Sequence, residues 1–291
     1  MAAPKKAAQA KAEPTKATPT KADGAATATE LPALHPDHVS ALVEGRHPRP
    51  HDALGQHPAT VGGVDGFVIR AVRPLAASVT AVQKDGTRIP LEHVASGLWH
   101  GFAPGAGQAY TLEAAYADAP NWTTDDPYRF VPTVGEVDLY LWGEGRHEQL
   151  WDVLGAHFRP HEDVVGTGFS VWAPHAQAAR VIGDFNNWDG TQHAMRRLDD
   201  NGVWELFIPG LMPGSAYKFE LLTAAGEWVK RADPMARYTE VPPATASVVG
   251  QTLYEWGDGE WMTTRAQTDP HNAPMSVYEM HIGSWRPSPQ R

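Results

Sequence analysis

V-W-E-L-F-I-P-G, residues 203–210, is the stretch that decides the fold. It is a short run rich in β-branched and aromatic residues that stops at a Pro-Gly turn, which is the pattern of a β-strand. Y-K-F-E-L-L at residues 217–222 and E-W-V-K at residues 227–230 repeat the pattern, with Ala225-Gly226 as the turn between them. Three short strands joined by tight turns predict an antiparallel β-sandwich.

A loop that carries an aromatic residue precedes these strands. Phe169, Val171 and Ala173 alternate with polar or larger neighbours, and Val181-Ile182 follows, so two short strands lead into G-D-F-N-N-W-D-G at residues 183–190. The Trp188 indole is therefore expected on a loop that ends a strand.

The first half of the chain repeats the second. D-A-L-G-Q-H from Asp52 matches D-V-L-G-A-H from Asp152, and G-L-W-H-G-F-A-P-G from Gly97 matches the segment from Gly202. A-Y-T-L-E likewise matches A-Y-K-F-E, and all three pairs lie roughly 100 residues apart, which indicates two related modules in tandem. The strands expected in the first module are residues 67–72, 79–83, 98–102 and 110–116. This copy has V-Q-K-D at residues 82–85 where the second has F-N-N-W, so we expect it to lack the aromatic loop.

The composition narrows the class of protein. The 25 Pro and 27 Gly fit many short strands broken by turns better than long helices. A formal charge of −10 argues against nucleic acid or an anionic membrane as the partner. No cysteine is present, which excludes disulfides and thiolate chemistry, and with no apolar signal segment at the N-terminus the cytoplasm is favoured. We expect no cofactor, and no metal at His47, His51 and His57, because their proline-rich surroundings are typical of a rigid turn.

The motifs of the second module resemble a known family. F-N-N-W, Y-K-F-E-L and G-E-W-V-K-R-A-D-P are similar to the glycogen- and starch-binding β-sandwich modules attached to α-amylase-superfamily enzymes. The segment from Asp126 through E-V-D-L-Y-L-W-G-E-G-R-H, and Y-E-M-H-I-G-S-W-R-P from Tyr278, resemble the bacterial glycogen branching enzymes. The resemblance covers roughly residues 33–291 and implies an enzyme that cuts an α-1,4-glucan and rejoins it as an α-1,6 branch.

The expected architecture is all-β, with two tandem immunoglobulin-like β-sandwiches joined by a short helix. The chain would end at the first strand of a truncated (β/α)₈ barrel, Ser276–Ile282, whose missing neighbours leave Tyr278, Met280 and Ile282 exposed. The expected segments are a disordered tail at 1–32, a first module at 33–140, a connecting helix at 141–160, a second module at 161–256, a linker at 257–273 and the barrel start at 274–291. Leu150 and Leu154 give the helical spacing, while Trp142 and Trp151 are interpreted as packing residues between the modules.

Four residues form the candidate carbohydrate site. A glucose residue offers a C–H face that lies against an indole and hydroxyls that need polar partners. The resemblance implies that Trp188 and Trp228 are two walls of a sugar platform and that Lys218 and Asn187 hydrogen-bond hydroxyls. Lys218 alternates with Tyr217 and Phe219, which predicts that it faces solvent. The structural alternative is that Trp188 caps the sandwich edge and Trp228 packs on a strand.

No catalytic residue is expected within residues 1–291. Retaining transfer between glucans needs two carboxylates about 5 Å apart at the ends of barrel strands. The resemblance places these on later barrel strands, so the expected partners are α-1,4-glucan and the chain's own missing barrel. Two alternatives remain open, a free-standing glycogen-binding module without catalysis and a debranching or trehalose-releasing relative.

Overall fold

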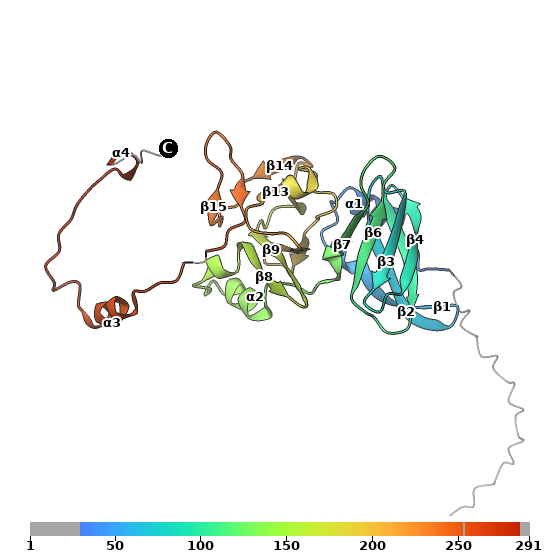
Figure 1. Ribbon diagram of the computed structural model, residues 1–291, viewed down its shortest axis with the longest axis horizontal. Coiled ribbons are helices and arrows are strands. Elements are labelled where there is room, and N and C mark those ends of the chain that lie inside the picture. Colours follow the sequence, from blue (N-terminus) through green and yellow to red (C-terminus); the bar gives the residue numbers. More distant parts are fainter. Residues whose placement is uncertain (1–29, 253, 286–291) are drawn as a thin grey trace, which may run out of the picture. The chain divides into compact units, whose positions relative to one another are not determined.

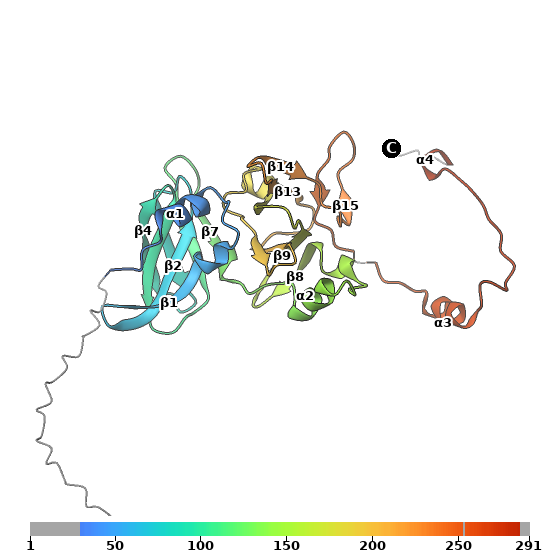
Figure 2. The same ribbon diagram turned by 180° about the vertical axis from the view of Figure 1, so that it is seen from behind.

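The computed structural model describes residues 30–252 and 254–285. Of these, residues 30–250 belong to one compact unit, and those from Gln251 onward belong to a second. The prediction of a disordered tail over residues 1–32 lies, except for its end, outside the described residues. Within the first unit two β-sandwiches lie side by side, with β7 of the first on the side that faces the second (Figures 1 and 2). The predicted all-β architecture of two tandem sandwiches is confirmed.

The first module begins with a short helix, in which Pro36 occupies the first turn and Gly45, just past the end, has a φ of 61°. Its strands pair in the order β1-β2-β5-β4-β3-β6-β7. The elements are α1 (Pro36–Val43), a 3₁₀ turn (Pro50–Asp52), β1 (Gly55–Val61), β2 (Val64–Val72), β3 (Ser78–Gln83), β4 (Arg88–Ala95), β5 (Leu98–Pro104), β6 (Tyr110–Ala115), β7 (Trp122–Asp125) and a 3₁₀ turn (Pro127–Arg129).

Strand β4 closes the first sandwich because it belongs to both layers. Its first half pairs with β3, as in Val79 with Leu91, and its second half pairs with β5, as in Glu92 with His100. The register shifts between His93 and Ala95, and an extra residue of this kind bends a strand. Between the layers lie the alternate, inward-facing side chains, which include Ile69, Ala71, Val79, Ala81, Leu91, Trp99, Tyr110 and Leu112.

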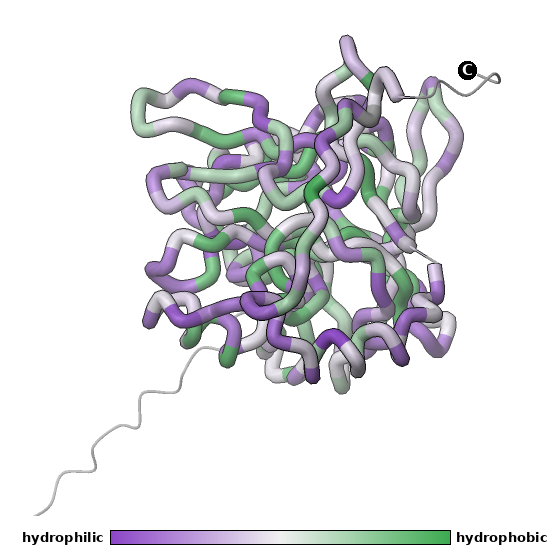
Figure 3. Tube along the Cα trace, turned by 90° about the vertical axis from the view of Figure 1, so that its left-hand side faces the viewer, coloured by the Kyte–Doolittle hydropathy of each residue, from purple (hydrophilic) through white to green (hydrophobic). Residues whose placement is uncertain are grey.

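The second module is built from two sheets with the orders β8-β9-β12-β11 and β10-β13-β16-β15, and β14 also pairs with β13. Along the trace, hydrophobic and hydrophilic residues alternate repeatedly (Figure 3), as expected for strands with one buried face. The elements are α2 (Glu136–Gly143), a 3₁₀ turn (Leu150–Asp152), β8 (Gly155–His161), β9 (Val164–Trp172), β10 (Ala178–Gly183), η4 (Asp184–Asn186), β11 (Arg196–Leu198), β12 (Val203–Pro209), β13 (Ala216–Leu222), β14 (Trp228–Arg231), β15 (Tyr238–Thr239) and β16 (Ser247–Val248).

One hydrophobic core runs from the second module into the first. Phe169, Trp204 and Tyr217 belong to the same buried cluster as Leu42 and Tyr128. Polar contacts cross the same boundary, since the Tyr128 hydroxyl donates to the Gln192 carbonyl over 3.2 Å and accepts from the Ala194 amide over 3.0 Å. The two sandwiches therefore share buried apolar area, which is the main stabilising contribution to such a contact.

Each module repeats one buried contact at its end. The Tyr110 hydroxyl donates to the Asp126 carboxylate over 2.6 Å, and the Tyr217 hydroxyl donates to the Asp233 carboxylate over 2.5 Å. Each aspartate also caps the turn that follows it by accepting from the backbone amide two residues on, at Tyr128 and Met235. Each of the two Asp-Pro pairs therefore forms a structural turn.

The connecting helix lies earlier than predicted. The segment 145–155 contains only the 3₁₀ turn Leu150–Asp152, whereas the helix between the modules is α2, Glu136–Gly143. Glu136 and Asp138 in its first turn favour a helix start there. Trp142 packs against Trp172 of the second module, with ring centres 5.5 Å apart, and Trp151 is 59% exposed. The interpretation of these two residues as packing between the modules is therefore wrong.

The second unit differs from the prediction in two places. The expected linker contains a helix, α3 (Gly259–Gln267), and residues 276–281 form no strand before the short helix α4 (Ile282–Trp285). A strand needs a neighbour to take up its backbone hydrogen bonds, and no described segment pairs with this one. Tyr278 and Met280 are exposed, as predicted, while the Ile282 side chain lies outside the described part.

Candidate functional site

The loop between β10 and β11 is folded by its own asparagine. The Asn186 side chain accepts from the Gly183 amide over 2.9 Å and donates to the Val181 carbonyl over 2.9 Å. These two bonds fix the orientation of the Asn186 amide, whose nitrogen also lies 3.0 Å from Nδ1 of His193. The loop is therefore held by the hydrogen bonds of the Asn186 side chain as well as by the packing of Phe185 against the core.

Trp188 occupies an unusual backbone conformation in this loop. Asn187 has a φ of 54° and Trp188 a φ of 61°, in the left-handed region that costs a bulky residue about 1–2 kcal/mol. The Trp188 amide donates to the Gly183 carbonyl over 2.9 Å, and its indole Nε1 donates to the Asp184 carboxylate over 2.9 Å. The ring is half-buried, while the neighbouring Asn187 is exposed. Backbone strain of this kind is concentrated at functional sites.

Lys218 is less free than predicted. It lies on β13 opposite Ile182, beside the start of the loop, and it faces away from the core as expected. Its side chain is nevertheless half-buried, and its Nζ donates to the Thr245 hydroxyl over 2.7 Å. This contact fixes the ammonium group near the loop. The prediction that Lys218 faces solvent is therefore right for its direction but not for its exposure, since the side chain is half-buried.

Trp228 has one ring face covered. It lies on β14 opposite Leu222, and the Arg180 guanidinium is 3.6 Å from its ring centre. Arg180 also pairs with Glu220 over 2.6 Å and donates to the Glu44 carbonyl of the first module over 3.1 Å. The structural alternative for Trp228 is therefore right in part, because the residue packs on its sheet through one face and is half-buried.

Strand pairing brings two of the four predicted residues, Lys218 and Trp228, to one face. Lys218 and Leu222 are four residues apart on β13, so their side chains point to the same side of the sheet. Because Leu222 pairs with Trp228, Lys218 and Trp228 both lie on the outer side, about 13 Å apart along the strand. The loop that carries Asn187 and Trp188 starts from Gly183, which pairs with Tyr217 beside Lys218.

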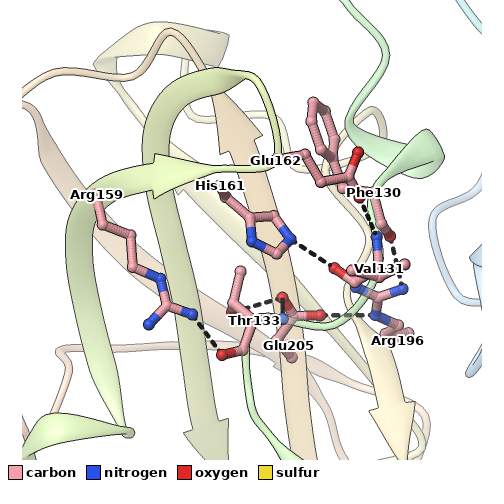
Figure 4. A network of polar contacts seen from close by, with 8 residues as sticks. All are labelled: Phe130, Val131, Thr133, Arg159, His161, Glu162, Arg196 and Glu205. Atoms are coloured by element: carbon pink, nitrogen blue, oxygen red, sulfur yellow. Dashed lines mark hydrogen bonds and ion pairs between the residues drawn. The ribbon is translucent and has the colours of Figure 1, made fainter. Parts of the chain in front are cut away.

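A buried polar network holds the segment between the modules (Figure 4). Arg196 pairs with Glu205 over 2.6 Å and donates to the Phe130 carbonyl over 3.0 Å. Glu205, which is fully buried, also accepts from the Thr133 amide over 3.0 Å and from its hydroxyl over 2.7 Å. The Thr133 carbonyl accepts from Arg159. These bonds fix residues 130–133 against the outer side of β12.

The three histidines near the N-terminus serve the local fold. His47 accepts from the Arg49 amide over 3.2 Å, and the His57 ring lies 2.9 Å from the Leu54 carbonyl. Burial lowers the pKa of His51 well below its usual value. Among the described residues no three His, Cys, Asp or Glu side chains are grouped as a metal would require. No helix in the described ranges is long and apolar enough to cross a membrane.

Sequence reasoning missed a cleft between the modules. It has a volume of about 350 Å³ and is lined by residues of both sandwiches, among them Arg73, Trp122 and His193. These three lie far apart in the sequence, and no motif links them. Burial, together with the positive charge of Arg73, lowers the pKa of His193 to about 3, so its ring is neutral at physiological pH.

Comparison with known proteins assigns each module. Residues 35–128 match the model of the "alpha-1,4-glucan branching enzyme GlgB, N-terminal domain", and residues 153–236 match "Carbohydrate-binding module 48 (Isoamylase N-terminal domain)". The 1,4-alpha-glucan branching enzyme GlgB of Leifsonia xyli subsp. xyli is 51% identical over 262 residues, which are 89% of this chain and 36% of that protein.

Two further relatives agree. The 1,4-alpha-glucan branching enzyme GlgB 2 of Streptomyces coelicolor is 51% identical over 88% of this chain and 34% of that protein, and GlgB of Thermobifida fusca is 52% identical over 86% and 33%. The chain thus spans about a third of the length of the curated relatives it matches. With both domain models in the order found here, the chain matches the N-terminal region of the GlgB family of 1,4-alpha-glucan branching enzymes.

Proposed function

We propose that this chain is the glucan-positioning N-terminal region of a 1,4-α-glucan branching enzyme. The whole enzyme would cleave an α-1,4-linked chain and rejoin the segment as an α-1,6 branch. Within it, the outer face of β10, β13 and β14, together with the loop 183–190, would hold the glucan. The curated relatives named above as branching enzymes, and the match to a carbohydrate-binding module, support this proposal.

The observation that carries the proposal is the fixed indole of Trp188. A tryptophan on a loop usually gains little from a left-handed backbone, yet here the conformation is held by bonds to Gly183 and Asp184. A ring that is already immobile loses little side-chain entropy when a sugar stacks on it. Trp188 and the uncovered face of Trp228 would stack on glucose residues, while Lys218 and Asn187 would hydrogen-bond hydroxyls.

We assign no catalytic residue to this chain. Transfer would require a carboxylate pair supplied by a barrel that the chain contacts as its partner in the whole enzyme. The chain alone would bind glucan without branching it. Its place of action would be the cytoplasm, as the cysteine-free composition favours.

Binding and chemistry are tested separately. The purified chain should be retarded in a native gel that contains glycogen. Incubated with amylose, it should produce no new α-1,6 signal by NMR and no fall in iodine absorbance. Free migration in glycogen would contradict the binding role, and enzyme-dependent α-1,6 linkages would contradict the assignment of catalysis to the barrel.

A further inference from the structure

We propose that the cleft between the two sandwiches is a second glucan site, which takes a short α-1,4-linked segment separately from the Trp188 surface. This inference rests on the proposed function for its ligand class. The cleft volume of about 350 Å³ falls in the usual range of small-molecule sites, about 300–1,000 Å³. Arg73 and Trp122 line it from the first module, and Phe185, Gln192, His193 and Leu211 line it from the second.

Arg73 gives the cleft unpartnered donors. Only 3% of the residue is exposed, and its side chain makes one hydrogen bond to the described part of the chain, from Nη1 to the Val72 carbonyl over 2.9 Å. It forms no ion pair within 4.0 Å among those residues. A guanidinium has five N–H donors, and Nε and Nη2 of Arg73 are not among the buried atoms that lack a partner in the described residues, so they reach solvent in the cleft. A ligand in the cleft can accept hydrogen bonds from them in place of water.

A buried carboxylate, that of Asp126, interacts with the positive charge of Arg73. Burial raises the pKa of Asp126, and the positive charge of Arg73 is the largest effect that opposes this rise. The Asp126 carboxylate accepts hydrogen bonds from Tyr110 and Tyr128, so it lies near Arg73 without occupying its donors. Arg73 therefore offers directional N–H groups, and its positive charge interacts with the Asp126 carboxylate. Sugar hydroxyls can accept from these donors, as a phosphate also can, so competition by phosphate distinguishes the two ligand classes.

His193 supplies a second donor, its Nε2–H, because the hydrogen bonds of Asn186 determine the tautomer of the ring. The Asn186 amide nitrogen is identified by its bond to the Val181 carbonyl, so it donates to Nδ1 of His193 as well. Since Nδ1 accepts, the proton of the neutral ring is on Nε2. No residue in the described ranges accepts from Nε2. The cleft thus combines a neutral imidazole donor with the guanidinium.

Aromatic surface completes the chemistry of a sugar site. Trp122 is 45% exposed on the edge strand β7, and Phe185 is half-buried, with its ring centre 5.5 Å from that of His193. The C–H face of a glucose residue lies well on such rings, and its hydroxyls reach the donors. Phe185 comes from the same loop as Trp188, so this single loop contributes an aromatic ring to the cleft and another to the outer surface.

The test uses the full chain and maltotriose as the probe. Amide NMR signals of Gln192 and Leu211 report on the cleft, and those of Asn187 and Lys218 report on the outer surface. Both sets should shift saturably. Trp122→Ala should weaken the response at the cleft roughly tenfold while leaving the outer surface unchanged, and Trp188→Ala should do the reverse. Trp151→Ala, which removes an exposed indole elsewhere, is the matched control and should change neither.

Arg73→Lys keeps the charge but loses the forked donors, so it should also weaken the cleft response, with a thermal melt to show that the variant is folded. β-Cyclodextrin, a closed ring too large for this cleft, should shift only the outer-surface signals. Silent cleft signals beside a responsive outer surface would overturn this inference alone, whereas silence at both would also refute the proposed function. Displacement of maltotriose from the cleft by inorganic phosphate would identify an anion site and overturn the proposal.

Discussion

The Arg180 guanidinium lies 3.6 Å from the centre of the Trp228 ring and 2.6 Å from a carboxylate oxygen of Glu220. The same arginine donates to the Glu44 carbonyl at the end of helix α1. The first module therefore fixes the residue on which Trp228 rests, although it contributes none of the four candidate residues on the outer surface. In the proposed site only the opposite face of Trp228 would be open to a glucan.

Removing the Trp188 ring should separate binding from folding. Trp188→Ala is expected to weaken glycogen binding by about 1–3 kcal/mol, the usual cost of losing an aromatic anchor. The melting temperature should change little, because the ring lies on a loop outside the core clusters. Glycogen affinity electrophoresis and a thermal melt measure the two effects.

Trp204→Ala is the contrasting variant. Its side chain is fully buried, and such truncations cost about 3–5 kcal/mol of folding stability. It should destabilise the module strongly. If Trp188→Ala lowered the melting temperature as much as Trp204→Ala, Trp188 would be a core residue and the platform hypothesis would fail.

Asp184 should act on binding through Trp188. Asp184→Ala removes the acceptor of the indole Nε1, so the ring gains freedom that a sugar must remove, and affinity should fall by about 1 kcal/mol. Asp184→Asn retains a side-chain oxygen and should keep most of the affinity. Equal losses in both variants would show that the carboxylate charge, rather than indole orientation, matters.

Breaking the buried pair of Arg196 and Glu205 should loosen the segment between the modules. Glu205→Gln leaves the Arg196 charge buried without its counterion, which typically costs about 3–5 kcal/mol. The double variant Arg196→Met/Glu205→Leu removes both charges and should recover part of the loss. Urea unfolding of the parent, of Arg196→Met and Glu205→Leu singly, and of the double variant gives the coupling energy. A Glu205→Gln variant as stable as the parent would contradict the structural role of this pair.

His193 should make the protein acid-sensitive. Its pKa of about 3 in the folded state lies below the usual 6.5, because burial disfavours the charged ring. As the pH falls, His193 is therefore protonated in the unfolded chain before it is protonated in the folded chain. Its contribution to folding stability is complete above pH 6.5 and falls by about 1.4 kcal/mol per pH unit as the pH drops towards 3.

Urea unfolding from pH 7 to 4 measures this slope. The His193→Gln variant should show a shallower slope than the parent over this range. His175→Gln, at an exposed position, is the matched control and should leave the slope unchanged. A parental slope in the His193 variant would show that the proton is taken up elsewhere.

The strands were predictable where turn residues mark their ends or where apolar and polar residues alternate. V-W-E-L-F-I ends at Pro-Gly and Y-K-F-E-L-L alternates, so β12 and β13 were found from local pattern alone. β4 was missed because Pro90 interrupts its pattern and because it divides its pairing between two layers. The misplaced helix shows that Leu150 and Leu154 at helical spacing are weak evidence beside the acidic first turn of α2.

The sequence singles out the candidate residues but says nothing of their environment in the folded chain. The motifs drew attention to Trp188, Lys218 and Trp228, but the cover on Trp228 comes from Arg180, which no local pattern links to it. The cleft depends on Arg73 and His193 from different modules. Contacts of this kind are set by how the two sandwiches pack, and a linear pattern does not contain that information.

The central claim is that Trp188 and Trp228 contact α-1,4-glucan directly. The most direct measurement is a titration of the chain, labelled with ¹⁵N at tryptophan, with maltoheptaose, in which each indole N–H signal is followed by NMR. We expect the Trp188 and Trp228 signals to shift saturably with the same affinity, while the exposed Trp151 signal stays in place. Saturable binding of maltoheptaose that leaves the Trp188 and Trp228 signals unmoved would contradict the claim.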